Sequence, residues 1–178
     1  MSRASLLLCG LLLSGSAGCT PSLRASPRAS PASTPDLVEL HRMLDAFHHA
    51  ASVADEEAYF AVFLDDAVFL GTDATERWSK AEFEAWAMPY FQRESAWTYT
   101  PSDRFAALAP CGMVAWFDER LSNDQYGELR GTGVARLTDQ GWRLAQYSLT
   151  FLVPNERAKE VVGVIRSESP TPAPGGDP

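Results

Sequence analysis

The residues best suited to chemistry lie in one predicted hairpin, in the runs AWFDE and YGELRGTGV. If Leu121 pairs with Gly127 across the turn, Asp118 faces Arg130 on the neighbouring strand. Because side chains alternate between the two faces of a strand, Trp116 shares their face. An arginine beside a carboxylate and a tryptophan could hold a polar ligand group against an apolar wall. The alternative is a cross-strand ion pair on the solvated face, which stabilises little.

Glu119 is the alternative acid, since it points to the face opposite Asp118. Either carboxyl could act as a general acid or base if an apolar pocket raised its pKa by desolvation. Arg130 would oppose that rise at Asp118 by stabilising the carboxylate. Gln146, on the last long predicted strand, could offer its amide to a ligand, the alternative being a structural amide.

Aromatic residues are abundant, and most of them are expected in the core. Tyrosine and tryptophan also suit pockets that are apolar with one polar end. The polar loop 72–78 places Trp78 beside three charges, which fits either a functional loop or an exposed connection. We expect a ligand pocket lined by Tyr59, Trp78, Trp86, Tyr90, Trp97 and Trp116, together with Arg130 and Gln146.

The histidines, His41, His48 and His49, all fall in the first predicted helix. No cysteine or paired carboxylate stands near them at the spacing of zinc ligands, so we expect exposed histidines and no metal. The sequence has no glycine-rich phosphate loop and no nucleophile elbow, and we expect no cofactor. Cys111, at a predicted turn far from any histidine in sequence, is expected to be incidental rather than a nucleophile.

Three helices are predicted in the first half of the chain. The first begins at Thr34-Pro35-Asp36 and has about four turns, because apolar residues recur every three or four positions: Leu37, Leu40, Leu44, Phe47 and Ala51. The second has Asp55 as its N-cap and is stopped by Asp65 and Asp66, just before a buried strand at 67–70. The third opens with the capping-box pair Ser79 and Glu82 and bends or ends near Pro89.

After residue 94 the apolar pattern changes to a period of two, which indicates strands. Turn signals divide this half into strands at residues 97–108, 113–121, 127–137 and 142–153. A final helix, capped by Asn155, is predicted at 155–166. Helices followed by an antiparallel meander predict an α+β fold, in which a strongly curved sheet wraps the first helix and leaves a pocket at its open end.

Four runs carry a resemblance to a known family: VFLGTDATERW, AWFDE, YGELRGTGV and GWRLAQYSLTF. Together with the element order they resemble the SnoaL-like branch of the nuclear transport factor 2-like superfamily, over residues 36–164. The resemblance implies a cone-shaped barrel made by a curved, mainly antiparallel sheet around N-terminal helices, a fold also called cystatin-like. It also implies a homodimer, which is common in the family.

The enzymes of this superfamily include polyketide cyclases and, more distantly, ketosteroid isomerases and limonene-epoxide hydrolases. By resemblance, the base of the isomerases would fall near Gly71 and its partner acid near Gly133, and glycine can do neither task. The SnoaL cyclases use an aspartate–histidine arrangement, whereas the strands predicted here contain no histidine. We therefore do not expect either mechanism to be inherited.

The ends of the chain indicate export. Arg3 precedes an apolar run at 6–13 that is too short to span a bilayer, as in a signal peptide. Small residues before Cys19 resemble a lipoprotein cleavage site, the alternative being an ordinary secretory signal. We assign residues 1–19 to the signal, 20–34 to a disordered tether rich in proline and serine, 35–166 to the SnoaL-like domain and 167–178 to a disordered proline-rich tail. The expected location is the bacterial cell envelope, periplasm-facing or at the outer membrane.

The composition is acidic, with a net charge of −8. Nucleic acid is therefore not expected as a partner, and anions would be repelled at long range, although a local arginine could still bind one. The first hypothesis is a lipid-anchored domain that binds a small hydrophobic or amphipathic molecule. The second is a small isomerase, cyclase or hydrolase that uses Asp118. The third is a dimerisation or scaffold module.

Overall fold

The computed structural model describes residues 37–168, and the predicted signal, tether and most of the tail lie outside them. Its elements are α1 (Leu37–Ser52), α2 (Glu56–Ala61), β1 (Phe63–Leu70), β2 (Arg77–Ser79), α3 (Lys80–Phe91), β3 (Thr100–Leu108), β4 (Val114–Asn123), β5 (Gly127–Thr138), β6 (Gly141–Phe151), the short 3-10 helix η1 (Asn155–Arg157) and α4 (Ala158–Glu168). The predicted α+β class is confirmed.

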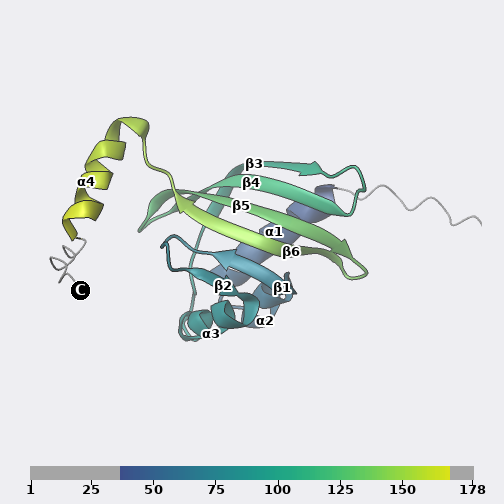
Figure 1. The fold of residues 1–178 in the computed structure, drawn as a ribbon. Coiled ribbons are helices and arrows are strands. Elements are labelled where there is room, and N and C mark those ends of the chain that lie inside the picture. Colours follow the sequence, from purple (N-terminus) through teal and green to yellow (C-terminus); the bar gives the residue numbers. More distant parts are fainter. Residues whose placement is uncertain (1–36, 169–178) are drawn as a thin grey trace, which may run out of the picture. The chain divides into compact units, whose positions relative to one another are not determined.

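The strands form one curved six-stranded sheet in the order β2-β1-β6-β5-β4-β3, which is not closed into a full barrel (Figure 1). Only β1 and β6 are parallel, and the other neighbours run antiparallel. Helix α1 crosses one face of this sheet and contacts β3 and β6, while α3 packs against β1 and β2. We call the face that α1 covers the inner face.

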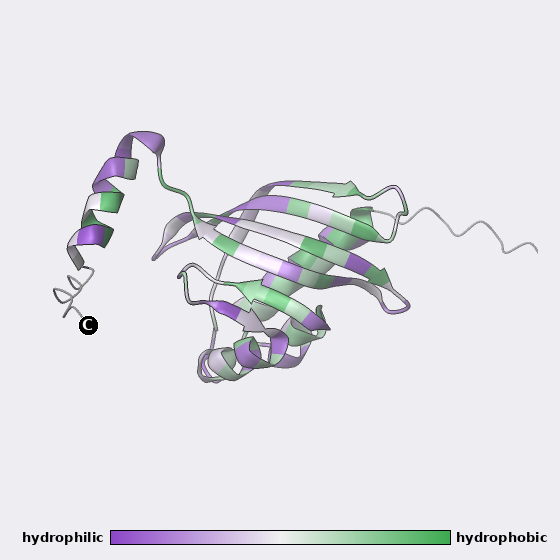
Figure 2. Ribbon diagram, viewed as in Figure 1, coloured by the Kyte–Doolittle hydropathy of each residue, from purple (hydrophilic) through white to green (hydrophobic). Residues whose placement is uncertain are grey.

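Helix α1 is amphipathic, as the sequence predicts. Leu40, Leu44 and Phe47 are buried against the sheet, while other positions of the helix face solvent. Along the strands apolar and polar residues alternate (Figure 2), and Ala115, Phe117 and their cross-strand neighbours complete the core on the inner face. Burial of these side chains, each worth about 1.5–3 kcal/mol when large, holds helix and sheet together.

The boundary between the second helix and the first strand differs from the prediction. Helix α2 ends at Ala61, and β1 already begins at Phe63, which pairs with Leu144 of β6. Phe63 fits a helical spacing and also a strand in which Phe63, Ala67 and Phe69 are buried. Pairing with β6 decides between the two, because sheet hydrogen bonds and burial outweigh local propensity.

The predicted starts of the second and third helices are confirmed, whereas the start predicted for the first helix, at residues 34–36, lies outside the described residues. The Asp55 carboxylate accepts a hydrogen bond from Ala58 N, and Ser79 and Glu82 form the capping box of α3. Helix α3 runs through Pro89 to Phe91 rather than ending at the proline. The loop predicted at 72–78 ends in β2, which pairs with β1.

The predicted pairing of the hairpin is wrong. Strand β4 continues to Asn123, which pairs with Gly127, so Asp118 lies opposite Thr132 and Arg130 lies opposite Arg120. The Asn123 side-chain oxygen, Oδ1, accepts hydrogen bonds from the backbone N–H groups of Gln125 and Tyr126 and thereby lengthens the turn. Because the shift is two residues, every side chain keeps the face that alternation assigns to it.

The C-terminal region is partly as predicted. Asn155, expected to cap a helix, lies instead in η1, and α4 follows to Glu168, two residues into the predicted tail. Helix α4 exposes Val162, Val164 and Ile165. Within residues 37–168, no helix is both long and apolar enough to cross a membrane.

Gly133 offers a test of the packing on the inner face. A Cβ at this position would lie 2.6 Å from Phe117 Cζ and 2.6 Å from the Gln146 carbonyl oxygen. We expect Gly133→Ala to lower the free energy of unfolding by about 1–3 kcal/mol, because the core would be overpacked. Chemical denaturation measures this change, with Gly163→Ala as a control, since nothing lies within 4 Å of its added Cβ. An unchanged midpoint in Gly133→Ala would contradict the close packing.

Candidate functional site

A cavity of about 360 Å³ opens between the helices and the inner face of the sheet. Aromatic rings dominate its lining and come from the three N-terminal helices, from β1, β2 and β6, and from the segments that precede β3 and β5. The aromatic residues of the lining are Phe47, Tyr59, Phe69, Trp78, Phe83, Trp86, Tyr90, Trp97, Tyr99, Tyr126, Tyr147 and Phe151.

Several of these rings are nearly parallel. Phe69 and Phe83 stack with centroids 3.8 Å apart and planes at 10°, and Trp78 lies at 14° to Phe83. Trp86 continues the series at 4.9 Å and 28° from Trp78. Tyr147 flanks Phe69 at 20° on the other side. Stacking fixes these rings in place, so this part of the cavity is preformed rather than adaptable.

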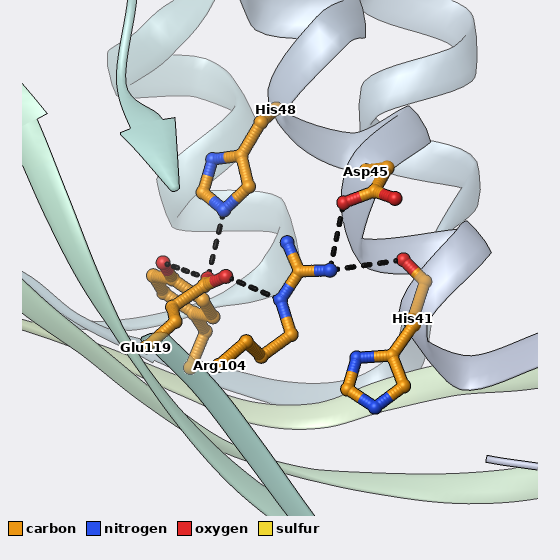
Figure 3. A network of polar contacts seen from close by, with 6 residues as sticks. His41, Asp45, His48, Arg104 and Glu119 are labelled. Atoms are coloured by element: carbon orange, nitrogen blue, oxygen red, sulfur yellow. Dashed lines mark hydrogen bonds and ion pairs between the residues drawn. The ribbon is translucent and has the colours of Figure 1, made fainter. Parts of the chain in front are cut away.

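The most buried polar group lies just behind the cavity. Glu119 of β4 has no exposed surface, yet three side chains bind its carboxylate. His48 Nε2 lies 2.7 Å from Oε1, Tyr147 Oη donates to the same oxygen at 3.2 Å, and Arg104 Nε donates to Oε2 at 2.7 Å. Figure 3 shows His48 and Arg104 both reaching the Glu119 carboxylate, His48 from the helix above it and Arg104 from beside it. His48 and Tyr147 also line the cavity, which links this network to the ligand space.

Arg104 also ties the sheet to helix α1. Its Nη1 donates to Asp45 Oδ1 at 2.7 Å and to the His41 carbonyl oxygen at 3.1 Å (Figure 3). Its Nη2 is buried and has no hydrogen-bond partner among the described residues. One guanidinium therefore connects the sheet carboxylate, a helix carboxylate and the helix backbone.

A β-bulge places Arg104 in this position. Ser102 pairs with Arg120 and Phe105 with Asp118, so Asp103 and Arg104 together stand opposite Glu119 alone. Asp103 adopts a left-handed backbone conformation with φ of 45°. An extra residue at a bulge re-aims the following side chains. Here it turns Arg104 to the inner face while Phe105 stays exposed.

The network keeps Glu119 ionised. Burial alone would raise the pKa of this carboxyl, but the hydrogen bonds and positive charge supplied by His48 and Arg104 outweigh burial and lower the pKa from its usual 4.5. Burial, together with the neighbouring Glu119 charge, raises the pKa of Tyr147 well above the ordinary value for tyrosine. Tyr147 therefore stays protonated and acts as a hydrogen-bond donor to the carboxylate.

The structure divides the predicted site residues into two groups. Five line the cavity: Tyr59, Trp78, Trp86, Tyr90 and Trp97. The remaining four do not line it: Trp116, Asp118, Arg130 and Gln146. They lie on the outer face of the sheet, the one opposite α1, where Trp116 is 52% exposed. The predicted Asp118–Arg130 pair therefore does not form, whereas Glu119, the alternative acid, faces inward.

The sequence reasoning also missed three members of the network. His48 was expected to be exposed, but it is only 7% exposed. Its position, four residues after Leu44 and next to Phe47, is the signal that could have placed it on the buried face of α1. Tyr147 shares the inner face of β6 with Leu149, two residues further along the strand. Arg104 had no such signal, because the bulge that turns it inward interrupts the alternation. Within residues 37–168, no group of histidine, cysteine and carboxylate side chains could hold a metal ion.

The buried carboxylate gives a pH-dependent test. Glu119→Gln removes the charge that Arg104 and His48 face, so at pH 7 we expect a loss of about 3 kcal/mol in the free energy of unfolding. The pKa of Glu119 is lower in the folded chain than its usual 4.5. The natural protein therefore has its full advantage in free energy of unfolding over the variant above that pH. The advantage shrinks as the pH falls through the folded value, since the unfolded chain takes up the proton first.

Denaturation curves between pH 3 and pH 7 measure this difference. Asp118→Asn is the matched control, since it changes the adjacent carboxylate on the outer face and should cost little at any pH. Equal effects of the two substitutions on the free energy of unfolding at pH 7 would refute the conclusion that the Glu119 network stabilises the fold.

Comparison with known proteins identifies the domain. The family model of the SnoaL-like domain matches residues 40–154. No curated protein matches the chain. Among solved structures, a domain of unknown function with a cystatin-like fold from Nostoc punctiforme has a TM-score of 0.61 at 15% identity, covering 75% of this chain and 87% of its own.

Two further structures show the same fold. A proposed aromatic ring hydroxylase from Novosphingobium aromaticivorans has a TM-score of 0.56 at 21% identity, covering 67% of this chain and 90% of its own. A proposed dehydratase of the NTF2-like family from Streptomyces avermitilis has a TM-score of 0.57 at 15% identity, covering 67% of this chain and 97% of its own. The chain therefore belongs to the SnoaL-like domain family and has the nuclear transport factor 2-like, or cystatin-like, fold.

Proposed function

We propose that the domain binds a small hydrophobic or amphipathic molecule in the aromatic cavity. The observation that carries this proposal is the cavity itself, whose volume of about 360 Å³ lies in the usual range for small-molecule sites. The stacked rings of its wall offer a large apolar surface that is already ordered, so little conformational entropy would be lost on binding.

Polar groups are few and are placed at two levels. The buried part of the lining contains His48 and Tyr147, and the more accessible part contains Thr72, Glu76, Arg93, Asn123 and Gln125. The Arg93 guanidinium lies over the Tyr90 ring, 4.7 Å from its centroid. A ligand with an apolar body and a polar group would match this arrangement better than a fully apolar one.

A second candidate function is proton-transfer catalysis by His48. The observation that favours it is the position of the imidazole, which lines the cavity while Glu119 orients it through Nε2. A buried carboxylate behind a histidine is a common way to orient a general base. The neighbouring structures include a proposed dehydratase and a proposed hydroxylase, which agrees with catalysis but shows only the fold. Conversion of a bound molecule, read as a changed NMR spectrum of the molecule after incubation with the protein, distinguishes catalysis from simple binding, because an isomerisation leaves the mass unchanged.

Two tryptophans provide a matched test of the cavity. Trp86 lines it and is 42% exposed, whereas Trp116 is 52% exposed on the outer face. We expect Trp86→Ala to weaken binding of the flat probe 2-methoxynaphthalene about 5- to 20-fold, because a stacked aromatic contact is lost. Trp116→Ala should leave affinity unchanged. Titrations followed by fluorescence measure both, and equal affinities of the two variants, or no binding by the natural protein, would count against the proposed site.

We also propose that the chain is exported and anchored to the cell envelope through a lipid on Cys19. The support is the signal pattern and the small residues that precede this cysteine. We expect Cys19→Ala to abolish labelling by radioactive palmitate and to move the protein from the membrane fraction to the soluble fraction. Cys111→Ala, at an exposed cysteine of the domain, should change neither result. Unlabelled natural protein in the culture medium would instead support the secretory alternative.

A further inference from the structure

Two polar side chains at the buried end of the cavity, His48 and Tyr147, direct their hydrogen bonds at Glu119, which leaves acceptors toward a ligand. His48 and Tyr147 are both part of the lining, and both direct a polar atom at the same oxygen of Glu119, Oε1. Arg104 occupies the other oxygen, Oε2, at 2.7 Å. The carboxylate is thus surrounded on both oxygens by groups that can donate.

An ionised carboxylate only accepts hydrogen bonds. Tyr147 must therefore donate its O–H to Glu119, and His48 must donate the proton on Nε2. When His48 is neutral, the ring nitrogen that lacks the proton is an acceptor, so its Nδ1 presents a lone pair. Nδ1 makes no hydrogen bond to any residue in the described part of the chain. The Tyr147 oxygen, whose O–H donates its hydrogen bond to Glu119, likewise offers only lone pairs to a ligand.

We infer that the cavity selects a compact aromatic molecule that brings a hydrogen-bond donor, such as a phenolic or enolic O–H, to His48 Nδ1. This inference rests on the proposed binding function and adds the chemical class of the ligand. A donor on the ligand makes a hydrogen bond to Nδ1. An ether or carbonyl oxygen in the same place would also be an acceptor, so the two atoms would repel and Nδ1 would stay without a hydrogen bond. The surrounding rings of Phe47 and Phe69 supply no donor that could replace it.

The charged groups near His48 are compatible with a ligand that donates a hydrogen bond to Nδ1. Glu119 and Arg104 form a compensated pair, and Asp45 is the further acid that Arg104 binds. If the ligand is acidic, its proton can lie on either the ligand oxygen or Nδ1. The complex then has the same total charge in both cases, and the imidazolium that would form is stabilised by Glu119 through Nε2.

Three related probes test the inference on the full protein at pH 8. They are 2-naphthol, 2-methoxynaphthalene, in which a methyl group replaces the hydroxyl proton, and naphthalene. We expect 2-naphthol to bind at least 10-fold more tightly than the methyl ether, because an unmatched buried acceptor is costly.

His48→Gln is the informative variant, since glutamine can keep an N–H toward Glu119, while its acceptor oxygen is on the same carbon as that nitrogen and does not occupy the position of Nδ1. It should reduce the preference for 2-naphthol to less than threefold while naphthalene affinity persists. His41→Gln, on the same helix but outside the cavity lining, should retain the full preference. Equal binding of the three probes, or a preference that survives in His48→Gln, overturns the inference and leaves the binding function standing. Failure of all three to bind overturns both.

The tautomer of His48 provides a second measurement that needs no variant. Nitrogen-15 NMR of the natural protein should show the proton of the neutral imidazole on Nε2 and the lone pair on Nδ1. A proton found on Nδ1 in the neutral form would overturn the inference directly.

Discussion

Desolvation of the Glu119 carboxylate is the constraint on which the rest of the domain depends. A charge with no exposed surface is stable only if hydrogen bonds and opposite charge replace the lost water. His48 comes from α1, Arg104 from β3 and Tyr147 from β6, so satisfying one group joins three separate elements. The same contacts set the position of α1 on the sheet and therefore the shape of the cavity beside it.

The aromatic packing complements this polar network. Phe69, Phe83 and Trp78 stack on one another, and these rings are at once core and cavity wall. Rings held by their neighbours cannot collapse into the empty space, which explains how a domain with so many apolar side chains keeps an open cavity. The buried polar end and the rigid apolar wall are thus products of the same packing. A single ligand can meet both.

Much of this architecture follows from the sequence, and the failures have identifiable physical causes. Periodicity and caps predict α1, the start of α3 and the strands of the meander, because each is a local pattern repeated over many residues. The start of β1 depends on pairing with β6, and the hairpin register depends on the Asn123 turn. Among the site residues, the cavity-lining aromatics were predictable from residue type. Arg104 was not, because its orientation depends on a bulge, and His48 was assigned to the wrong side of its helix.

The two glycines that, by resemblance, fall near the acids of the ketosteroid isomerases leave little space for a side chain. A Cβ at Gly71 would lie 2.1 Å from Glu76 Oε2, and one at Gly133 would lie 2.6 Å from Phe117 Cζ. Neither position has room for a carboxylate unless Glu76 or Phe117 moves. The buried acid of this protein comes instead from β4, because alternation turns Glu119 inward while Asp118 turns outward. Since the sheet has no histidine, α1 supplies one, and the buried chemistry of the cavity rests on a helix–sheet pair, His48 and Glu119.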